Sequence, residues 1–230
     1  MANNLDLEEQ EQLDQLKHFW TQYGNVITWS LIAVLGVVAA WNGFNIWQRN
    51  QSVQAAAMYD EVERVVKSAD TAKIDRVFAD MKDKYASTTY AQQAGLLVAK
   101  HYFSIGNVDA TKAALTWVAD KASDQGYQAV AKLRLAGVLM ESKAFDEALQ
   151  QLSGSFPTSF DALLADRKGD IFLLQGKKTE ALAEYLKAYK NFEERTEYRR
   201  LVEVKLISLG VDPQNSLAIR NDTQVSEGKK

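Results

Sequence analysis

At 230 residues, of which 47% are hydrophobic, the chain is long enough to bury the core of one substantial domain. It contains no cysteine, which excludes disulfides, thiol catalysis and thiolate metal sites. The formal net charge is −3, and residues 1–48 hold five acidic side chains but one basic side chain. The remainder is nearly neutral with both signs intermixed, so it lacks the basic patch of a nucleic-acid-binding protein.

The first predicted element is a membrane-spanning helix over residues 19–48, a stretch without a charged residue. A helix of about 20 mostly apolar residues crosses about 30 Å of hydrocarbon. Aromatic side chains such as Trp20 and Trp47 stand at its two ends, where amphipathic rings favour the headgroup zones. Gly36 and Ala40 form a small-xxx-small pair, so we predict that they contact a second transmembrane helix.

A buried core helix and a cleaved signal peptide are the two alternatives to an anchor. The residues at 38–40 resemble a small-residue cleavage site. However, the preceding segment is acidic and the uncharged run exceeds the length of a signal core, so we predict an uncleaved signal-anchor. Charge does not decide the orientation, because Lys17 precedes the span and Arg49 follows it.

Helical patterns separated by short turn signals follow the span, and no segment alternates like a strand, so the fold class is all-α. Residues 51–67 contain no helix breaker, so the spanning helix runs on into the domain or bends only near residues 48–52. Further helices are predicted over residues 71–84, 89–104, 108–121, 124–141, 145–152, 160–175, 179–192 and 196–209. Residues 211–230 are polar and are interpreted as a loose tail.

Three helical hairpins align as repeats, offset by 37 and 33 residues, against a period of about 34 for tetratricopeptide repeats. Each unit has a small residue, an apolar residue three later, a turn at seven, a small residue at twelve and a large apolar residue at sixteen. These positions are Ala99, Tyr102, Gly106, Thr111 and Leu115; Ala136, Leu139, Lys143, Ala148 and Leu152; and Gly169, Phe172, Gly176, Ala181 and Tyr185. Lys143 and Thr111 depart from the pattern. Segments 71–84 and 196–209 would cap the array.

The residues that could carry chemistry predict no catalytic centre, cofactor site or metal site. His18 and His101 are the two histidines, and neither has a histidine partner four positions away. No phosphate-binding loop, dinucleotide fingerprint or serine-nucleophile motif occurs. Asp166 and Asp170 share a helix face, but we interpret them as a charged surface, with Arg167 as a partner of Asp170, rather than as paired catalytic carboxylates.

Partner binding is predicted on the first helix of each hairpin, which lines the concave surface of such arrays. Groove-facing candidates are Gln93, Leu96, Lys100, Phe103, Val130, Leu133, Met140, Leu163, Asp166, Asp170 and Leu173. Lys100, Asp166 and Asp170 are chosen as contacts because charge on an inward helix face has no packing reason to be there. Reversing Lys100 and Asp166 together is then expected to weaken binding and leave the melting temperature nearly unchanged.

Several segments carry a family resemblance. LKHFWTQYG (residues 16–24) precedes the span, and LVEVKLISLG (201–210) closes the domain. Between them lie YAQQAGLLVAKHYFSIGNVDAT (90–111), AVAKLRLAGVLMESKAFDEALQQL (129–152) and LLADRKGDIFLLQGKKTEAL (163–182). Together and in this order they resemble the bacterial ancillary SecYEG translocon subunits, inner-membrane proteins with a tetratricopeptide-like periplasmic domain.

The resemblance implies a cytoplasmic tail over residues 1–18, the anchor over 19–48, a periplasmic tetratricopeptide-like domain over 49–210, and a tail over 211–230 that extends beyond the family pattern. It also implies association with the SecYEG channel and with a membrane-anchored, prolyl-isomerase-like periplasmic chaperone. The expected function is therefore that of a non-enzymatic accessory subunit of the secretion channel. The alternatives are an anchored scaffold or regulator of a different envelope complex and, from another class, an anchored hydrolase.

Overall fold

The computed structural model describes residues 7–213, and the side chains of residues 11–213. Within this range every element is helical and no strand occurs, which confirms the all-α prediction. The elements are α1 (Leu7–Ser68), α2 (Thr71–Tyr85), α3 (Thr89–Ser104), α4 (Val108–Lys121), α5 (Gln125–Glu141), α6 (Phe145–Gln151), the 3-10 helix η1 (Thr158–Phe160), α7 (Asp161–Leu174), α8 (Lys178–Asn191) and α9 (Glu197–Ser208). Most of the predicted polar tail, residues 214–230, lies outside the described part of the chain.

The chain divides into two units, residues 1–53 and residues 54–230. The first unit contains the predicted anchor, and α1 continues through residues 48–52, which confirms that the helix predicted to span the membrane continues beyond residue 48. By length and composition, α1 is the one helix among the described residues that could cross a membrane. Only 6% of its most apolar window is buried, whereas a core helix of a soluble protein would be mostly buried.

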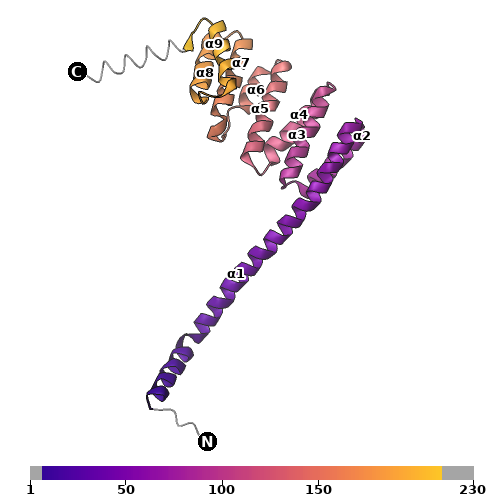
Figure 1. Ribbon diagram of the computed structural model, residues 1–230. Coiled ribbons are helices and arrows are strands. Elements are labelled where there is room, and N and C mark those ends of the chain that lie inside the picture. The colour runs from indigo at the N-terminus through magenta and orange to yellow at the C-terminus, as the bar shows by residue number, and fades with distance from the viewer. Residues whose placement is uncertain (1–6, 214–230) are drawn as a thin grey trace, which may run out of the picture. The chain divides into compact units, whose positions relative to one another are not determined.

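In the second unit, consecutive helices pack as neighbouring hairpins, α3 with α4, α5 with α6 and α7 with α8 (Figure 1). Side chains of the N-terminal helix (Ala55, Val62 and Val65) share one apolar core with α2 to α7. A second apolar cluster joins α7, α8 and α9, so α9 covers the C-terminal end of the array. This arrangement agrees with the predicted role of the last helix as a cap.

Helix ends explain why the hairpins turn where they do. Polar side chains cap four helix starts: Asp70, Thr88, Asn107 and Asp124 each accept a hydrogen bond from a backbone N–H of the first turn. At the predicted turn positions the backbone is left-handed, with φ of 75° at Gly106, 59° at Lys143 and 77° at Gly176. The three turns therefore share one geometry, and this confirms the repeat register.

Close packing within a hairpin depends on the small residues. A Cβ added to Gly169 would lie 2.5 Å from the ring of Tyr185, so α7 and α8 approach too closely for any other residue. Ala148 and Ala181, the small residues of the second helices, are fully buried. The predicted small positions thus bring the two helices of each hairpin into contact.

Candidate functional site: a groove between the repeats

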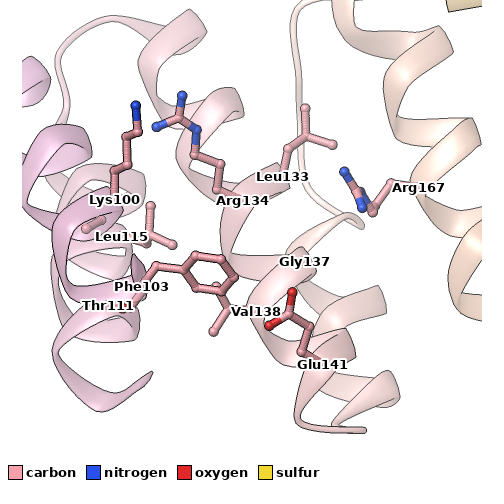
Figure 2. Close-up of a pocket in the computed structure, with 11 residues that line it drawn as sticks. Lys100, Phe103, Thr111, Leu115, Leu133, Arg134, Gly137, Val138, Glu141 and Arg167 are labelled. Atoms are coloured by element: carbon pink, nitrogen blue, oxygen red, sulfur yellow. The ribbon is translucent and has the colours of Figure 1, made fainter. Parts of the chain in front are cut away.

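The described part of the domain contains an open cavity of about 460 Å³ between the first two hairpins, with α7 on its far side (Figure 2). Four helices supply its walls: α3, α4, α5 and α7. The lining residues are Ala99, Lys100, Phe103, Thr111, Leu115, Leu133, Arg134, Gly137, Val138, Glu141 and Arg167. Three of these helices, α3, α5 and α7, are the first helices of consecutive hairpins, where the sequence predicts a groove, whereas α4 is the second helix of its hairpin.

The floor of the groove is apolar and packed. Leu115 is 2% exposed and Val138 is 6% exposed, so both belong to the domain core as well as to the groove. Above them the ring of Phe103 reaches from α3 toward α5 and is 45% exposed (Figure 2). A large aromatic side chain left half in solvent above an apolar floor is suited to contact another apolar group.

Charged side chains stand at the two ends of this floor. Lys100 and Arg134 extend together at one end, and Glu141 lies at the other (Figure 2). Arg134 and Glu141 are seven residues apart on α5, about 10 Å at 1.5 Å per residue. Among the described residues, no ion pair involves Lys100, Arg134 or Glu141. Their charges are available to a ligand.

Of the lining residues, the predicted groove set contains Lys100, Phe103 and Leu133, and the sequence reasoning missed the others, which include Arg167 and Gly137. Arg167 reaches the cavity from α7, and its Nη1 atom lies 4.0 Å from Oδ2 of Asp170, in agreement with the predicted pairing. Gly137 lies on α5 between the charged ends, and a Cβ added there would meet no atom within 4 Å. A Cβ at position 137 would therefore clash with no neighbouring atom, and a longer side chain there would start from the wall of the groove.

The structure corrects the prediction that Asp166 and Asp170 have no packing role. Asp166 is 1% exposed, accepts a hydrogen bond from the Tyr198 hydroxyl at 2.8 Å, and pairs with Nζ of Lys205 at 2.7 Å. Asp170 accepts a hydrogen bond from the Tyr185 hydroxyl at 2.8 Å and pairs with the same Nζ at 2.6 Å. The expectation that these charges lack a packing role is wrong, because they join α7 to α8 and α9, and neither lines the cavity.

Some of the other residues predicted to face the groove line it, and others make contacts within the domain. Lys100, Phe103 and Leu133 line the groove as expected. Gln93 instead donates a hydrogen bond to the Tyr127 hydroxyl at 2.7 Å, and Met140 packs against the core. The periodicity within a helix locates the inward face, but it does not separate the residues at the hairpin seam from those that border the open space.

The remaining sequence predictions concern the anchor and metal binding. Gly36 and Ala40 lie in the first unit, both are exposed, and a Cβ at Gly36 would meet no atom within 4 Å. Nothing else in the structure bears on a second transmembrane helix. Within residues 7–213 there is no group of three or more histidine, aspartate or glutamate side chains that could hold a metal ion.

Consecutive helical hairpins with a shared turn geometry define the class of tetratricopeptide-like repeat proteins, and this chain adds a long apolar N-terminal helix to them. Comparison with known families agrees, because the family described as "Tetratricopeptide repeat-like domain" matches residues 17–211. Among curated proteins, the chain is 30% identical over 207 residues to the ancillary SecYEG translocon subunit of Neisseria gonorrhoeae, covering 88% of this chain and 98% of that protein. The chain belongs to the family of ancillary SecYEG translocon subunits.

Further relatives carry the same name. The Haemophilus influenzae protein is 30% identical over 179 residues, which cover 76% of this chain and 85% of that protein. The Escherichia coli protein is 27% identical over 176 residues, which cover 75% and 83%. No solved structure matches the chain significantly.

Proposed function

We propose that this protein is a non-enzymatic accessory subunit of a SecYEG-type secretion channel, and that its repeat domain holds a segment of a partner protein in the groove lined by Phe103. The observation that carries the proposal is the groove itself, an apolar floor with an exposed aromatic ring and unpaired charges at both ends. The name shared by the relatives supplies the channel as the place of action. An open groove of this kind binds a chain segment better than it excludes water for catalysis.

The proposed membrane arrangement has residues 1–18 in the cytoplasm, residues 19–48 across the inner membrane, and residues 49–210 in the periplasm. The uncharged segment, its aromatic ends and the length of α1 support the span. A reporter that is active only in the periplasm, fused after Lys230, is expected to be active. A silent periplasmic fusion with an active cytoplasmic fusion would contradict this orientation.

The proposed partners are the SecYEG channel and a membrane-anchored, prolyl-isomerase-like periplasmic chaperone. We propose that the chaperone binds in the repeat groove. We further propose that the anchor contacts the channel through Gly36 and Ala40. Small residues permit close approach of two helices in lipid, which supports the second contact. The two contacts are separable because they lie in different units of the chain.

The experiment is purification of the tagged full-length protein from native membranes in mild detergent, with identification of the proteins that accompany it. We expect SecYEG subunits and the chaperone. Gly137→Phe, which fills the groove, should lower recovery of the chaperone severalfold, whereas Ala183→Phe on the exposed face of α8 should not. Recovery of a different envelope complex in place of SecYEG would favour the alternative of an unrelated scaffold.

The anchor has its own test. Gly36→Leu together with Ala40→Leu should reduce recovery of the channel and leave the groove intact. If the chaperone survives Gly137→Phe but is lost with the two anchor substitutions, the anchor is the recognition element and the groove has no part in recruitment.

A further inference from the structure

The charges around the groove are not balanced. Lys100, Arg134 and Arg167 bring three positive charges to its walls, and Glu141 brings the one negative charge. The second unit as a whole is close to neutral, so this local excess of positive charge is a property of the groove and not of the domain. A ligand that carries negative charge would gain from the excess.

Of the positively charged residues that line this cavity, Lys100 and Arg134 form no ion pair among the described residues. Lys100 comes from α3 and Arg134 from α5, and in Figure 2 both side chains extend toward the same end of the cavity. Arg167 is already near Asp170, so it is the less available of the three. An ammonium and a guanidinium on the walls of one cavity can both donate to a carboxylate bound there, and such charge-assisted hydrogen bonds are stronger than neutral ones.

The apolar floor begins next to this pair. Phe103 follows Lys100 by three residues on α3, and Gly137 follows Arg134 by three on α5, so the floor lies about 5 Å further along both helices. An extended chain advances about 3.3 Å per residue. A carboxylate held by Lys100 and Arg134 would therefore be one or two residues from the side chain that covers Phe103.

We propose that the groove selects a short acidic segment of a partner protein, in which an aspartate or glutamate lies one or two residues from a large apolar side chain. The inference rests on the proposed function and specifies its ligand. Lys100 and Arg134 bind the carboxylate, and Phe103 with the core residues beneath it binds the apolar side chain. Glu141 at the opposite end disfavours further acidic residues there, which gives the segment one direction in the groove.

Three fluorescein-labelled peptides test this selection by fluorescence anisotropy with the full-length protein in detergent. GSEELFSGS carries both features, GSKKLFSGS has basic residues in place of the acidic pair, and GSEESSSGS lacks the apolar side chains. We expect the first to bind about tenfold or more tightly than either analogue, since each loss removes at least one interaction worth a factor of about ten. The third peptide also distinguishes this site from one that attracts any anion.

Variants assign the effect to named residues. Lys100→Glu with Arg134→Glu should weaken binding of GSEELFSGS about tenfold or more and strengthen binding of GSKKLFSGS. Lys187→Glu with Lys190→Glu, two exposed positions on α8, changes the net charge equally and should leave both affinities unchanged. Glu141→Gln should not weaken the acidic peptide. Circular dichroism melts of each variant show whether the domain remains folded.

The proposal is overturned if GSKKLFSGS binds as well as GSEELFSGS, if no peptide binds at the highest soluble concentration, or if the groove reversal behaves like the α8 control. These results are distinct from failure of the proposed function. If the protein selects the acidic peptide but SecYEG does not co-purify, the proposed groove specificity is supported and the proposed association with the channel is contradicted. If recovery of the chaperone depends on position 137 but the peptides bind equally well, the proposed function is supported and the proposed acidic ligand is contradicted.

Discussion

Lys143 occupies the left-handed turn position that glycine fills in the other two hairpins. In all three turns the next backbone N–H bonds to a carbonyl five residues earlier, at 2.9 Å for Ala144 to Leu139. The surrounding hydrogen bonds thus hold a residue with a side chain in a conformation that costs about 1–2 kcal/mol for residues other than glycine. The strain at Lys143 arises from the geometry of the turn, and Lys143 is not among the residues that line the groove.

Replacing Lys143 with glycine should therefore raise the free energy of unfolding by about 0.5–1 kcal/mol. The gain is smaller than the strain because glycine also increases the entropy of the unfolded chain. Urea titration followed by circular dichroism measures the change. Gly106→Ala serves as the mirror experiment and should lower the free energy of unfolding by about 1 kcal/mol. A less stable Lys143→Gly variant would contradict this account of the turn.

The buried ion pair between Asp166 and Lys205 predicts a loss of stability when it is removed. Removing one member of a buried pair costs about 3–5 kcal/mol. Lys205 would keep Asp170 as a partner at 2.6 Å, so Asp166→Asn is expected to cost about 2–3 kcal/mol. Glu147→Gln, at an exposed position of α6, should change stability by no more than about 0.5 kcal/mol. Joint reversal of Lys100 and Asp166 would consequently lower the melting temperature, contrary to the expectation from sequence.

Tyr198 links the same cluster to pH. Burial, and then the charge and hydrogen bond of Asp166, raise the pKa of Tyr198 to about 12. Because the folded pKa lies above the unfolded value of about 10, the stabilisation is fully present below pH 10 and is lost as the pH rises through 12. Melting temperatures measured between pH 9 and pH 12 should fall less in Tyr198→Phe than in the unchanged protein. Equal slopes would show that this hydroxyl does not titrate with unfolding.

At the scale of the elements, close hairpin packing predicts the effect of enlarging its small residues. Ala148→Leu or Ala181→Leu should each lower the free energy of unfolding by about 1–3 kcal/mol, because both sites are fully buried between helices. Ala183→Leu is the matched control, because Ala183 lies on the same helix as Ala181 but is exposed. This substitution should leave the free energy of unfolding nearly unchanged. Thermal melts compare the three variants. Unchanged stability at both buried sites would mean that the helices separate at little cost.

The helices from α2 onward could be predicted to within one residue at each end because their signals are local, whereas α1 begins at Leu7, inside the segment that was predicted as a tail. Thr88 and Asn107 cap helix starts from adjacent positions, and Gly176 ends α7 through its own backbone. The role of Asp166 could not be predicted in this way, since its partner Lys205 lies 39 positions later and reaches it only when α9 packs on α7. A charged residue on an inward face is ambiguous until the neighbouring element is placed.

The groove was predicted in part for a related reason. Lys100 and Phe103 could be assigned to it from the inward face of α3 alone. Arg134 and Arg167 could not, because their access to the open space depends on how α5 and α7 are rotated relative to one another. Gly137 gave no signal in the sequence, where a glycine inside a helix indicates only a weak helix former. Its value as a blocking site comes from the empty space above it.

At the scale of the whole molecule, the chain joins a predicted membrane anchor to a repeat domain, and we propose a separate task for each. In the proposed function, the anchor would hold the protein in the inner membrane beside the channel, and the groove would bind a partner segment outside that membrane. The chain has no native cysteine, so single labels or cross-linkers can be placed without background. The two tasks can therefore be examined one position at a time in intact membranes.

The most direct measurement is photo-crosslinking in intact membranes from a benzoylphenylalanine placed at position 103 in the groove. The matched probe at position 183 lies on the exposed face of α8. The account predicts adducts from position 103 with a protein that co-purifies with SecYEG, their loss on adding Gly137→Phe, and none of these adducts from position 183. Equal adducts from both positions, or adducts from position 103 that persist when the groove is filled, would contradict the claim that the groove is where this protein binds its partner.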